Sequence, residues 1–137
     1  MATSPLILLI DGNQEDRDYY TQLLRTFSTD VVVLHAPTGH SGLALCKRQF
    51  IDCVVLEINL PDMSGYEVLR QLIPFTPDPG IAVIVLTRIS DHHLLETAIK
   101  YGAQATLCKT TISGDNLARA VQKAITTIQD RKRLHAV

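Results

Sequence analysis

The segment that decides the fold is Ile51-Asp-Cys-Val-Val-Leu-Glu-Ile-Asn-Leu-Pro-Asp-Met-Ser-Gly-Tyr-Glu-Val-Leu69. Its first part, Cys53–Ile58, is almost continuously apolar, which predicts a strand that is covered on both faces of a parallel sheet. Polar and turn-forming residues follow this run. A helical repeat of apolar side chains then begins near Gly65. The segment therefore predicts a strand, a loop and a helix in succession.

The same alternation extends along the rest of the chain. Four further apolar runs predict strands, and segments with a helical period lie between them. Five strands alternating with helices indicate a doubly wound α/β fold, in which a parallel sheet lies between two helical layers. The predicted strands are Leu6–Ile10, Val31–His35, Cys53–Ile58, Ile81–Leu86 and Ala105–Cys108.

Capping and turn residues predict where the helices begin and end. Asn13 and Ser90 are the expected N-caps of the first and fourth helices, because their side chains can accept hydrogen bonds from free backbone N–H groups. The last helix is expected over about 113–133 and could continue into another domain. The remaining boundaries are about Ser41 to Gln49 for the second helix, Gly65 to Pro74 for the third and Gly102 for the end of the fourth.

Length and composition favour one domain over residues 1–137 and exclude several classes of protein. A net charge of −1 offers no broad attraction to nucleic acid or to a membrane surface. The longest apolar runs are far shorter than the roughly 18 residues of a membrane-spanning helix, and the start lacks the features of a signal peptide. We therefore expect a cytoplasmic protein. Its cysteines, Cys46, Cys53 and Cys108, are expected as reduced thiols in the core.

Polar side chains stand where the predicted strands end, and ligands bind at this edge of open α/β sheets. Asp11 follows the first strand, and Glu57 lies near the end of the third. Thr87 and Lys109 follow the fourth and fifth strands. Because the carboxyl ends of parallel strands meet at one edge, we expect two carboxylates, a hydroxyl and an ammonium to share one polar pocket.

The segment quoted above resembles the central part of a response-regulator receiver domain, and the resemblance covers essentially the whole chain. It implies a flavodoxin-like fold with the strand order 2-1-3-4-5. It further implies that a histidine kinase transfers a phosphoryl group to an aspartate at the end of the third strand. The matching features are Asp11, the Asn59-x-Pro61-x-x-x-Gly65 loop, Thr87, the Tyr101–Ala103 turn and Lys109.

In such receivers an acidic pair, the acceptor aspartate and the main-chain carbonyl at the position of Asn59 hold Mg²⁺. The lysine and the threonine bind the phosphoryl oxygens, so transfer depends on positioning and charge neutralisation. This chain departs from that pattern at four positions. They are Glu57 at the phosphoacceptor, Gly12 at the second acid, Thr110 where proline usually follows the lysine, and Thr106 at the aromatic switch position.

These departures predict a weakened site. Gly12 removes one metal-ligating carboxylate, and the glutamate side chain places its carboxylate about 1.5 Å farther out than an aspartate would. Errors near 1 Å can cost about a hundredfold in rate. We therefore expect no cofactor, except Mg²⁺ bound weakly if at all through Asp11, Glu57 and the main chain of Asn59. Phosphoryl acceptance should be nearly abolished.

The sequence thus predicts an atypical receiver that is not an enzyme and acts as a protein-interaction module. Either Glu57 forms a permanent ion pair with Lys109 that replaces the phosphoryl switch, or the site is simply inactive. Two alternatives are a receiver that is phosphorylated at Glu57 or Asp11, and a small-ligand-binding flavodoxin-like domain. The latter lacks the phosphate-binding glycines it would need.

The expected partners are a histidine kinase or an output domain or protein. Receivers usually contact such partners through the face formed by the fourth helix, the fifth strand and the fifth helix. A second copy of this chain is a further candidate for that face. Nucleic acid and membrane are not expected as partners of this domain.

Overall fold

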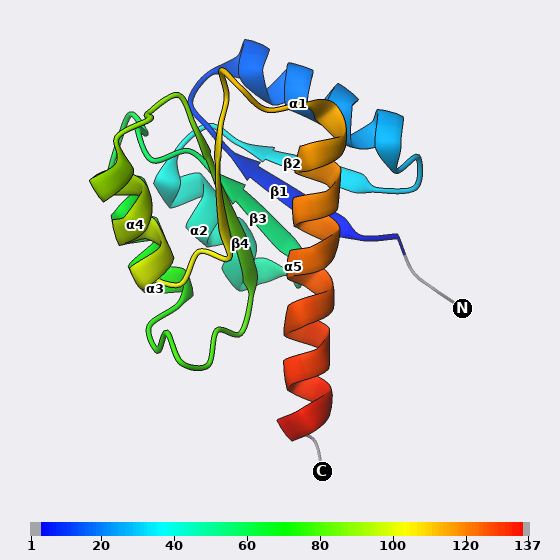
Figure 1. The fold of residues 1–137 in the computed structure, drawn as a ribbon, viewed down its shortest axis with the longest axis vertical. Coiled ribbons are helices and arrows are strands. Elements are labelled where there is room, and N and C mark those ends of the chain that lie inside the picture. Colours follow the sequence, from blue (N-terminus) through cyan, green and yellow to red (C-terminus); the bar gives the residue numbers. More distant parts are fainter. Residues whose placement is uncertain (1–3, 136–137) are drawn as a thin grey trace.

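The computed structural model describes residues 4–135 and contains a five-stranded parallel sheet whose strands, numbered along the chain, lie in the order 2-1-3-4-5. This confirms the predicted flavodoxin-like α/β class and its strand order (Figure 1). The strands are β1 (Leu6–Ile10), β2 (Val32–Ala36), β3 (Cys53–Leu56), β4 (Ala82–Thr87) and β5 (Ala105–Cys108). The helices are α1 (Gln14–Phe27), α2 (Gly39–Arg48), α3 (Gly65–Leu72), α4 (His92–Lys100) and α5 (Gly114–His135).

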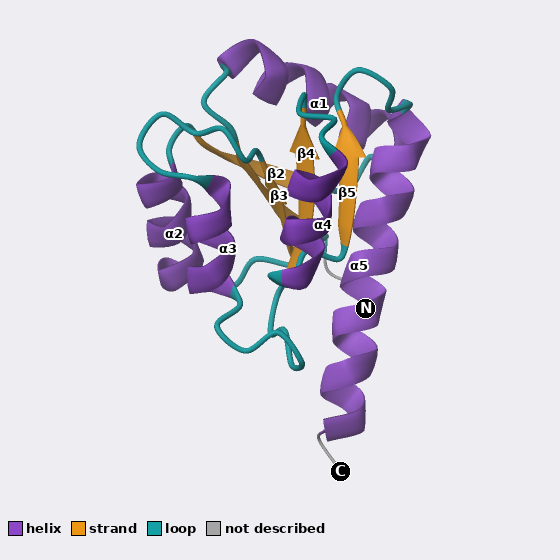
Figure 2. Cartoon of the chain, turned by 60° about the vertical axis from the view of Figure 1, so that its left-hand side comes forward, coloured by secondary structure: helices purple, strands orange, loops and turns teal. Residues whose placement is uncertain are grey.

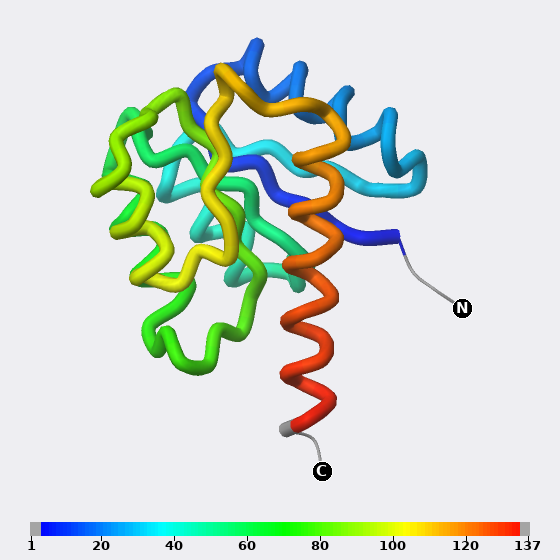
Figure 3. The backbone as a smooth tube through the Cα atoms, in the orientation of Figure 1, coloured from blue at the N-terminus to red at the C-terminus, as the bar shows by residue number. Residues whose placement is uncertain are grey.

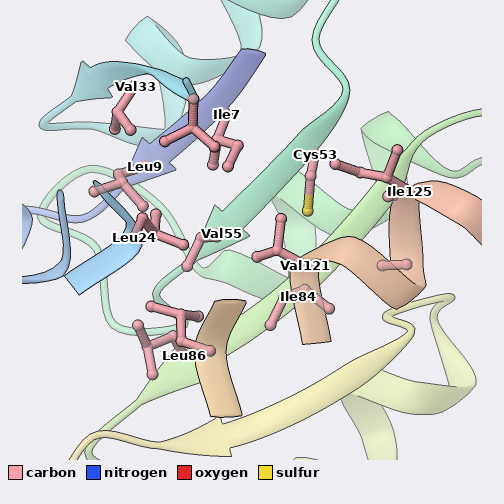
Figure 4. Close-up of a cluster of buried hydrophobic side chains, with 14 of the residues drawn as sticks. Ile7, Leu9, Leu24, Val33, Cys53, Val55, Ile84, Leu86, Val121 and Ile125 are labelled. Carbon is pink, nitrogen blue, oxygen red and sulfur yellow. The ribbon is translucent and has the colours of Figure 1, made fainter. Parts of the chain in front are cut away.

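The helices cover both faces of the sheet, because the three central strands carry apolar side chains on both sides. α1 and α5 lie over one face, and α2, α3 and α4 lie over the other (Figure 2). Figure 4 shows the first of these two cores, in which Leu24 of α1 and Val121 of α5 pack on Val55 of β3. Two filled cores hold the strand ends in fixed positions, as a precise site requires.

The boundaries of three strands differ from the prediction by one or two residues. β2 and β4 each begin and end one residue later than expected. β4 extends to Thr87 because this residue pairs with Cys108 of β5. β3 ends at Leu56 rather than at Ile58, since the carbonyl of Ile58 accepts the N–H of Gly65 at 2.7 Å and the chain turns back there.

Two helix starts were predicted wrongly. α2 begins at Gly39 behind the N-cap Thr38, and Ser41 is instead the third residue of a capping box with that threonine. α4 is capped by Asp91 and not by Ser90, because the Asp91 carboxylate accepts the N–H groups of His93 and Leu94. The predicted cap of α1 and start of α3 are confirmed. α5 extends to His135, two residues beyond the predicted end.

The prediction of three core cysteines holds for one of them. Cys53 is fully buried in β3, and Cys46 is partly exposed at the side of the second core. Cys108 lies at the end of β5 outside both cores, and hydrogen bonding with Thr110 lowers the pKa of its thiol. In residues 4–135 no helix combines the length and the apolar character needed to cross a bilayer.

Candidate functional site

The turns that follow β1, β3, β4 and β5 meet at one end of the sheet (Figure 3). Residues of these turns line a cleft of about 440 Å³. The structure thus brings together the four polar residues expected at the strand ends. It also adds residues of α1 and of the β4–α4 loop. The cleft is lined by Asp11, Gly12, Asn13, Asp16, Glu57, Asn59, Leu60, Pro61, Thr87, Arg88, Ile89 and Lys109.

The ammonium of Lys109 lies at the centre of this group, with only 2% of its side chain exposed. Its Nζ atom donates to Asp11 Oδ2 at 2.5 Å and to Asp16 Oδ2 at 2.9 Å. Oε1 of Glu57 lies 3.0 Å from the same nitrogen. Burial alone would lower the pKa of Lys109, but these three carboxylates outweigh it and raise the pKa above its usual value.

Glu57 is bent back on its own backbone. Its Oε2 atom accepts the N–H of Ile58 at 2.7 Å and the N–H of Asn59 at 3.2 Å. The sequence predicted a carboxylate that reaches farther into the cleft, but the extra methylene instead lets the side chain curl onto the strand end. The residue is 8% exposed, and both of its carboxylate oxygens have partners.

Asp11 is held by local backbone contacts as well as by Lys109. Its Oδ1 atom accepts the N–H of Asn13 at 2.9 Å, and its main-chain carbonyl accepts from Arg17 Nη1 at 2.6 Å. Gly12 follows in the turn, close to the neighbouring loop. A Cβ atom at this position would lie 3.0 Å from Cδ of Pro61, so an acid there would require the proline ring to shift slightly.

The loop after β3 is fixed by a close backbone contact. A Cβ atom on Gly65 would lie 2.6 Å from the carbonyl oxygen of Glu57 and from Cα of Ile58, so only glycine allows α3 to start this near the strand end. Asn59 and Pro61 of the loop line the cleft. This packing is a physical reason for the glycine of the Asn59–Gly65 motif.

The two threonines of the predicted pocket lie in different places. Thr87 is 1% exposed at the end of β4, and its Oγ1 atom accepts the N–H of Ile89 at 3.3 Å. Thr106 lies within β5 opposite Val85 and does not line the cleft. The position expected for an aromatic switch therefore carries a small polar side chain in the middle of an edge strand.

Sequence reasoning missed Asp16 and Arg88 as members of the site. Asp16 lies in the first turn of α1, where an acid is ordinarily explained by its favourable interaction with the helix dipole. Lys109 and Arg88 together lower the pKa of Asp16 although burial opposes this shift. One feature of the sequence could have indicated Asp16. Gly12 stands at the end of the first strand where a second acid is expected, and Asp16 is an acid four residues later, about one helical turn along the chain.

The residues present do not suit a divalent cation in this arrangement. Mg²⁺ prefers near-octahedral oxygen ligands, whereas Asp11, Asp16 and Glu57 are all directed at one ammonium. Among residues 4–135 no group of three or more acidic, histidine or cysteine side chains is arranged to hold a metal ion.

Comparison with known proteins gives a consistent result. The family model described as response regulator receiver domain matches residues 7–122. The chain is 26% identical over 119 residues to the transcriptional regulatory protein YdfI of Bacillus subtilis, covering 87% of this chain and 54% of that protein. It is 32% identical over 120 residues to the transcriptional regulatory protein UhpA of Escherichia coli, covering 88% of this chain and 58% of that protein.

The chain thus spans little more than half the length of these two relatives. Among solved structures, a response regulator receiver domain protein from Clostridium thermocellum superposes with a TM-score of 0.79 at 30% identity. That match covers 95% of this chain and 98% of the solved one.

Proposed function

This chain belongs to the response regulator receiver domain family and is a receiver domain of a two-component system, and we propose that it is an atypical one that signals without accepting a phosphoryl group at Glu57. Receiver domains are generally not enzymes, and they interact with histidine kinases and output domains. In this proposal residues 1–137 contain one receiver-like domain with a cytoplasmic location, and its output is a protein contact.

The observation that carries the proposal is the enclosure of Lys109 by carboxylates of its own chain. Two of its three N–H groups donate to Asp11 and Asp16, and Glu57 lies at 3.0 Å. A phosphoryl group on Glu57 would replace the single negative charge of its carboxylate with roughly −1.5 to −2, beside the carboxylates of Asp11 and Asp16. With Gly12 in place of an acid, a bound Mg²⁺ could not readily offset that charge. Mg²⁺ binding should therefore be weak or absent.

Between a fixed contact and an inactive site, the geometry favours the fixed contact. Both oxygens of Glu57 are engaged, one with Lys109 and the other with backbone N–H groups. The ion pair therefore holds the residue after β5 against the end of β3 with no modification of either side chain. Phosphorylation at Asp11 is the less favoured alternative, because its two oxygens accept from Asn13 and Lys109. No observation favours a small-ligand-binding domain.

We place the partner contact on the face formed by α4, β5 and α5. A groove of about 560 Å³ lies there, and Ile99, Lys123 and Arg131 are among the residues that line it. Ile99 is 47% exposed, which gives the face an apolar contact point beside basic side chains. A kinase, an output domain and a second copy of this chain are the candidate partners.

The test of the proposed function is exposure of the intact chain to acetyl phosphate and Mg²⁺, followed by mass spectrometry under conditions that preserve acyl phosphates. We expect no phosphoryl adduct on the wild-type protein. Glu57→Asp alone should also remain unmodified, because Gly12 still leaves the metal short of one acid. The double variant G12D/E57D should gain the adduct.

For each of the three proteins, one result would contradict the expectation. An adduct on the wild-type chain would overturn the proposed function. An adduct on the single variant E57D would contradict the role given to Gly12. If the double variant remains unmodified, beryllofluoride titration of its amide spectrum with Mg²⁺ tests the restored metal site directly, and unchanged spectra there would also contradict that role.

A further inference from the structure

Arg88 and Asp16 form an ion pair at the rim of the cleft, and we propose that this pair is a latch that holds the β4–α4 loop, residues 88–91, against α1 in place of a phosphoryl-dependent contact. The proposal rests on the proposed function, because it explains how the same site keeps one arrangement. It makes Asp16 and Arg88 positioning residues for α4.

One carboxylate joins three separate parts of the chain. Nη2 of Arg88 lies 2.9 Å from Oδ1 of Asp16 and 3.1 Å from Oδ2. The same Oδ2 atom accepts from Lys109 Nζ at 2.9 Å. Asp16 therefore connects the first turn of α1 with the loop after β4 and with the residue after β5.

Both sides of the latch are attached to ordered backbone. The N–H of Asp16 donates to the side chain of the N-cap Asn13 at 3.0 Å, which fixes the first turn of α1. On the other side, the carbonyl of Thr87 accepts the N–H of Lys109 at 2.8 Å, and its Oγ1 atom accepts the N–H of Ile89. The backbone on either side of Arg88 is thus held, and its side chain crosses to α1 from a defined position.

Asp16 of the latch supplies a negative charge that the turn after β1 lacks. Gly12 has no side chain, and Asp16 brings a carboxylate to Lys109 from one helical turn farther along. The Asp16 side chain is 14% exposed, so its ion pairs are partly removed from water and are worth more than ordinary surface pairs. Arg88, with 57% of its side chain exposed, can be changed without opening the core.

The loop leads directly into α4, so its position matters for the partner face. Asp91 at the end of the loop caps α4, and the carbonyl of Leu94 accepts the Tyr66 hydroxyl at 2.7 Å. The latch holds the approach to α4 from the side of α1, and Tyr66 of α3 holds its first turns from the opposite side. Together they define where the exposed face of α4 stands.

The test is amide hydrogen exchange of the full chain at residues 89–95 in the variants D16N and R88Q. We expect each variant to speed exchange there about three- to tenfold, since a lost ion pair favours local opening of the loop. The matched controls are D18N, an exposed acid on the same helix, and R119Q, an exposed arginine that pairs with Asp115 on α5. Both controls should leave exchange at residues 89–95 unchanged.

A double variant makes the test specific. If the two residues act through each other, D16N/R88Q should exchange no faster than the more affected single variant. Exchange at residues 89–95 equal to that of D18N in both single variants, or multiplied effects in the double variant, would overturn the latch.

Hydrogen exchange at the amides of β1 and β3 serves to detect destabilisation of the whole fold. If D16N raises exchange there as well, R88Q alone decides the outcome. Failure of the proposed function is detected separately, as a phosphoryl adduct on the wild-type chain.

Discussion

Glu57 differs from an aspartate by one methylene group, and that group changes where its carboxylate can go. Instead of extending into the cleft, the side chain bends back so that Oε2 reaches two backbone N–H groups while Oε1 faces Lys109. At the residue scale, the site is defined by the carboxylates that share the ammonium of Lys109.

Removal of that ammonium should destabilise the protein strongly. Lys109→Met leaves Asp11, Asp16 and Glu57 close together without their common counter-charge, and loss of one partner of a buried ion pair costs about 3 kcal/mol or more. Urea denaturation of this variant should therefore show a lower free energy of unfolding. The control is Lys123→Met, which changes the same residue type on the exposed face of α5. Equal losses in the two variants would contradict the central role of Lys109.

At the scale of elements, the ends of strands were more predictable than the contacts between helices and loops. Asp11, Thr87 and Lys109 were placed correctly in space because parallel strands bring their carboxyl ends together. Asp16 and Arg88 could not be placed, since they are 72 positions apart in the sequence. Their pairing depends on the conformations of two long-range neighbouring side chains, which the strand pattern does not determine.

The N-cap of α4 was predicted wrongly for a related reason. Ser90 and Asp91 are adjacent candidate caps, and only the three-dimensional position of the loop selects the aspartate.

The β3–α3 loop offers a prediction about backbone packing. Gly65→Ala should destabilise the fold by about 2 kcal/mol or more, because its Cβ would overlap the backbone of Glu57 and Ile58. Gly80→Ala is the matched control, since a Cβ there meets nothing within 4 Å. Thermal unfolding should show a clearly lower Tm for G65A and almost no change for G80A. A tolerated G65A would mean that the loop can move away from the strand end.

For the whole molecule, two cores on opposite faces of one sheet hold the elements, and polar contacts set how the loops meet above it. Asp62 links the β3–α3 loop to α2, because its carboxylate accepts the N–H groups of His40 and Gly39. These hydrogen bonds, that of His40 first, lower the pKa of Asp62 from 3.8 to about 2.

This shift predicts the direction of acid unfolding. A carboxyl group whose pKa is lower in the folded state stabilises the fold above its unfolded pKa, and the contribution is lost as pH falls. The free energy of unfolding of wild type should therefore decline between about pH 4 and pH 2 more steeply than that of Asp62→Asn. Asp30→Asn, at an exposed position, should keep the wild-type slope. Identical slopes for all three proteins would contradict the assignment to Asp62.

The enclosure of Lys109 also determines how long the signalling state lasts. A receiver that is switched by a labile phosphoryl group carries information in how long that group survives, and kinases and phosphatases set this lifetime. Counter-charges that belong to the chain are present from the moment it folds until it is degraded. Under the proposed function, the output of this domain depends on the number of copies in the cell and on the location of their partners. Synthesis and degradation of the protein then set the duration of the signal, instead of the lifetime of a phosphoryl group.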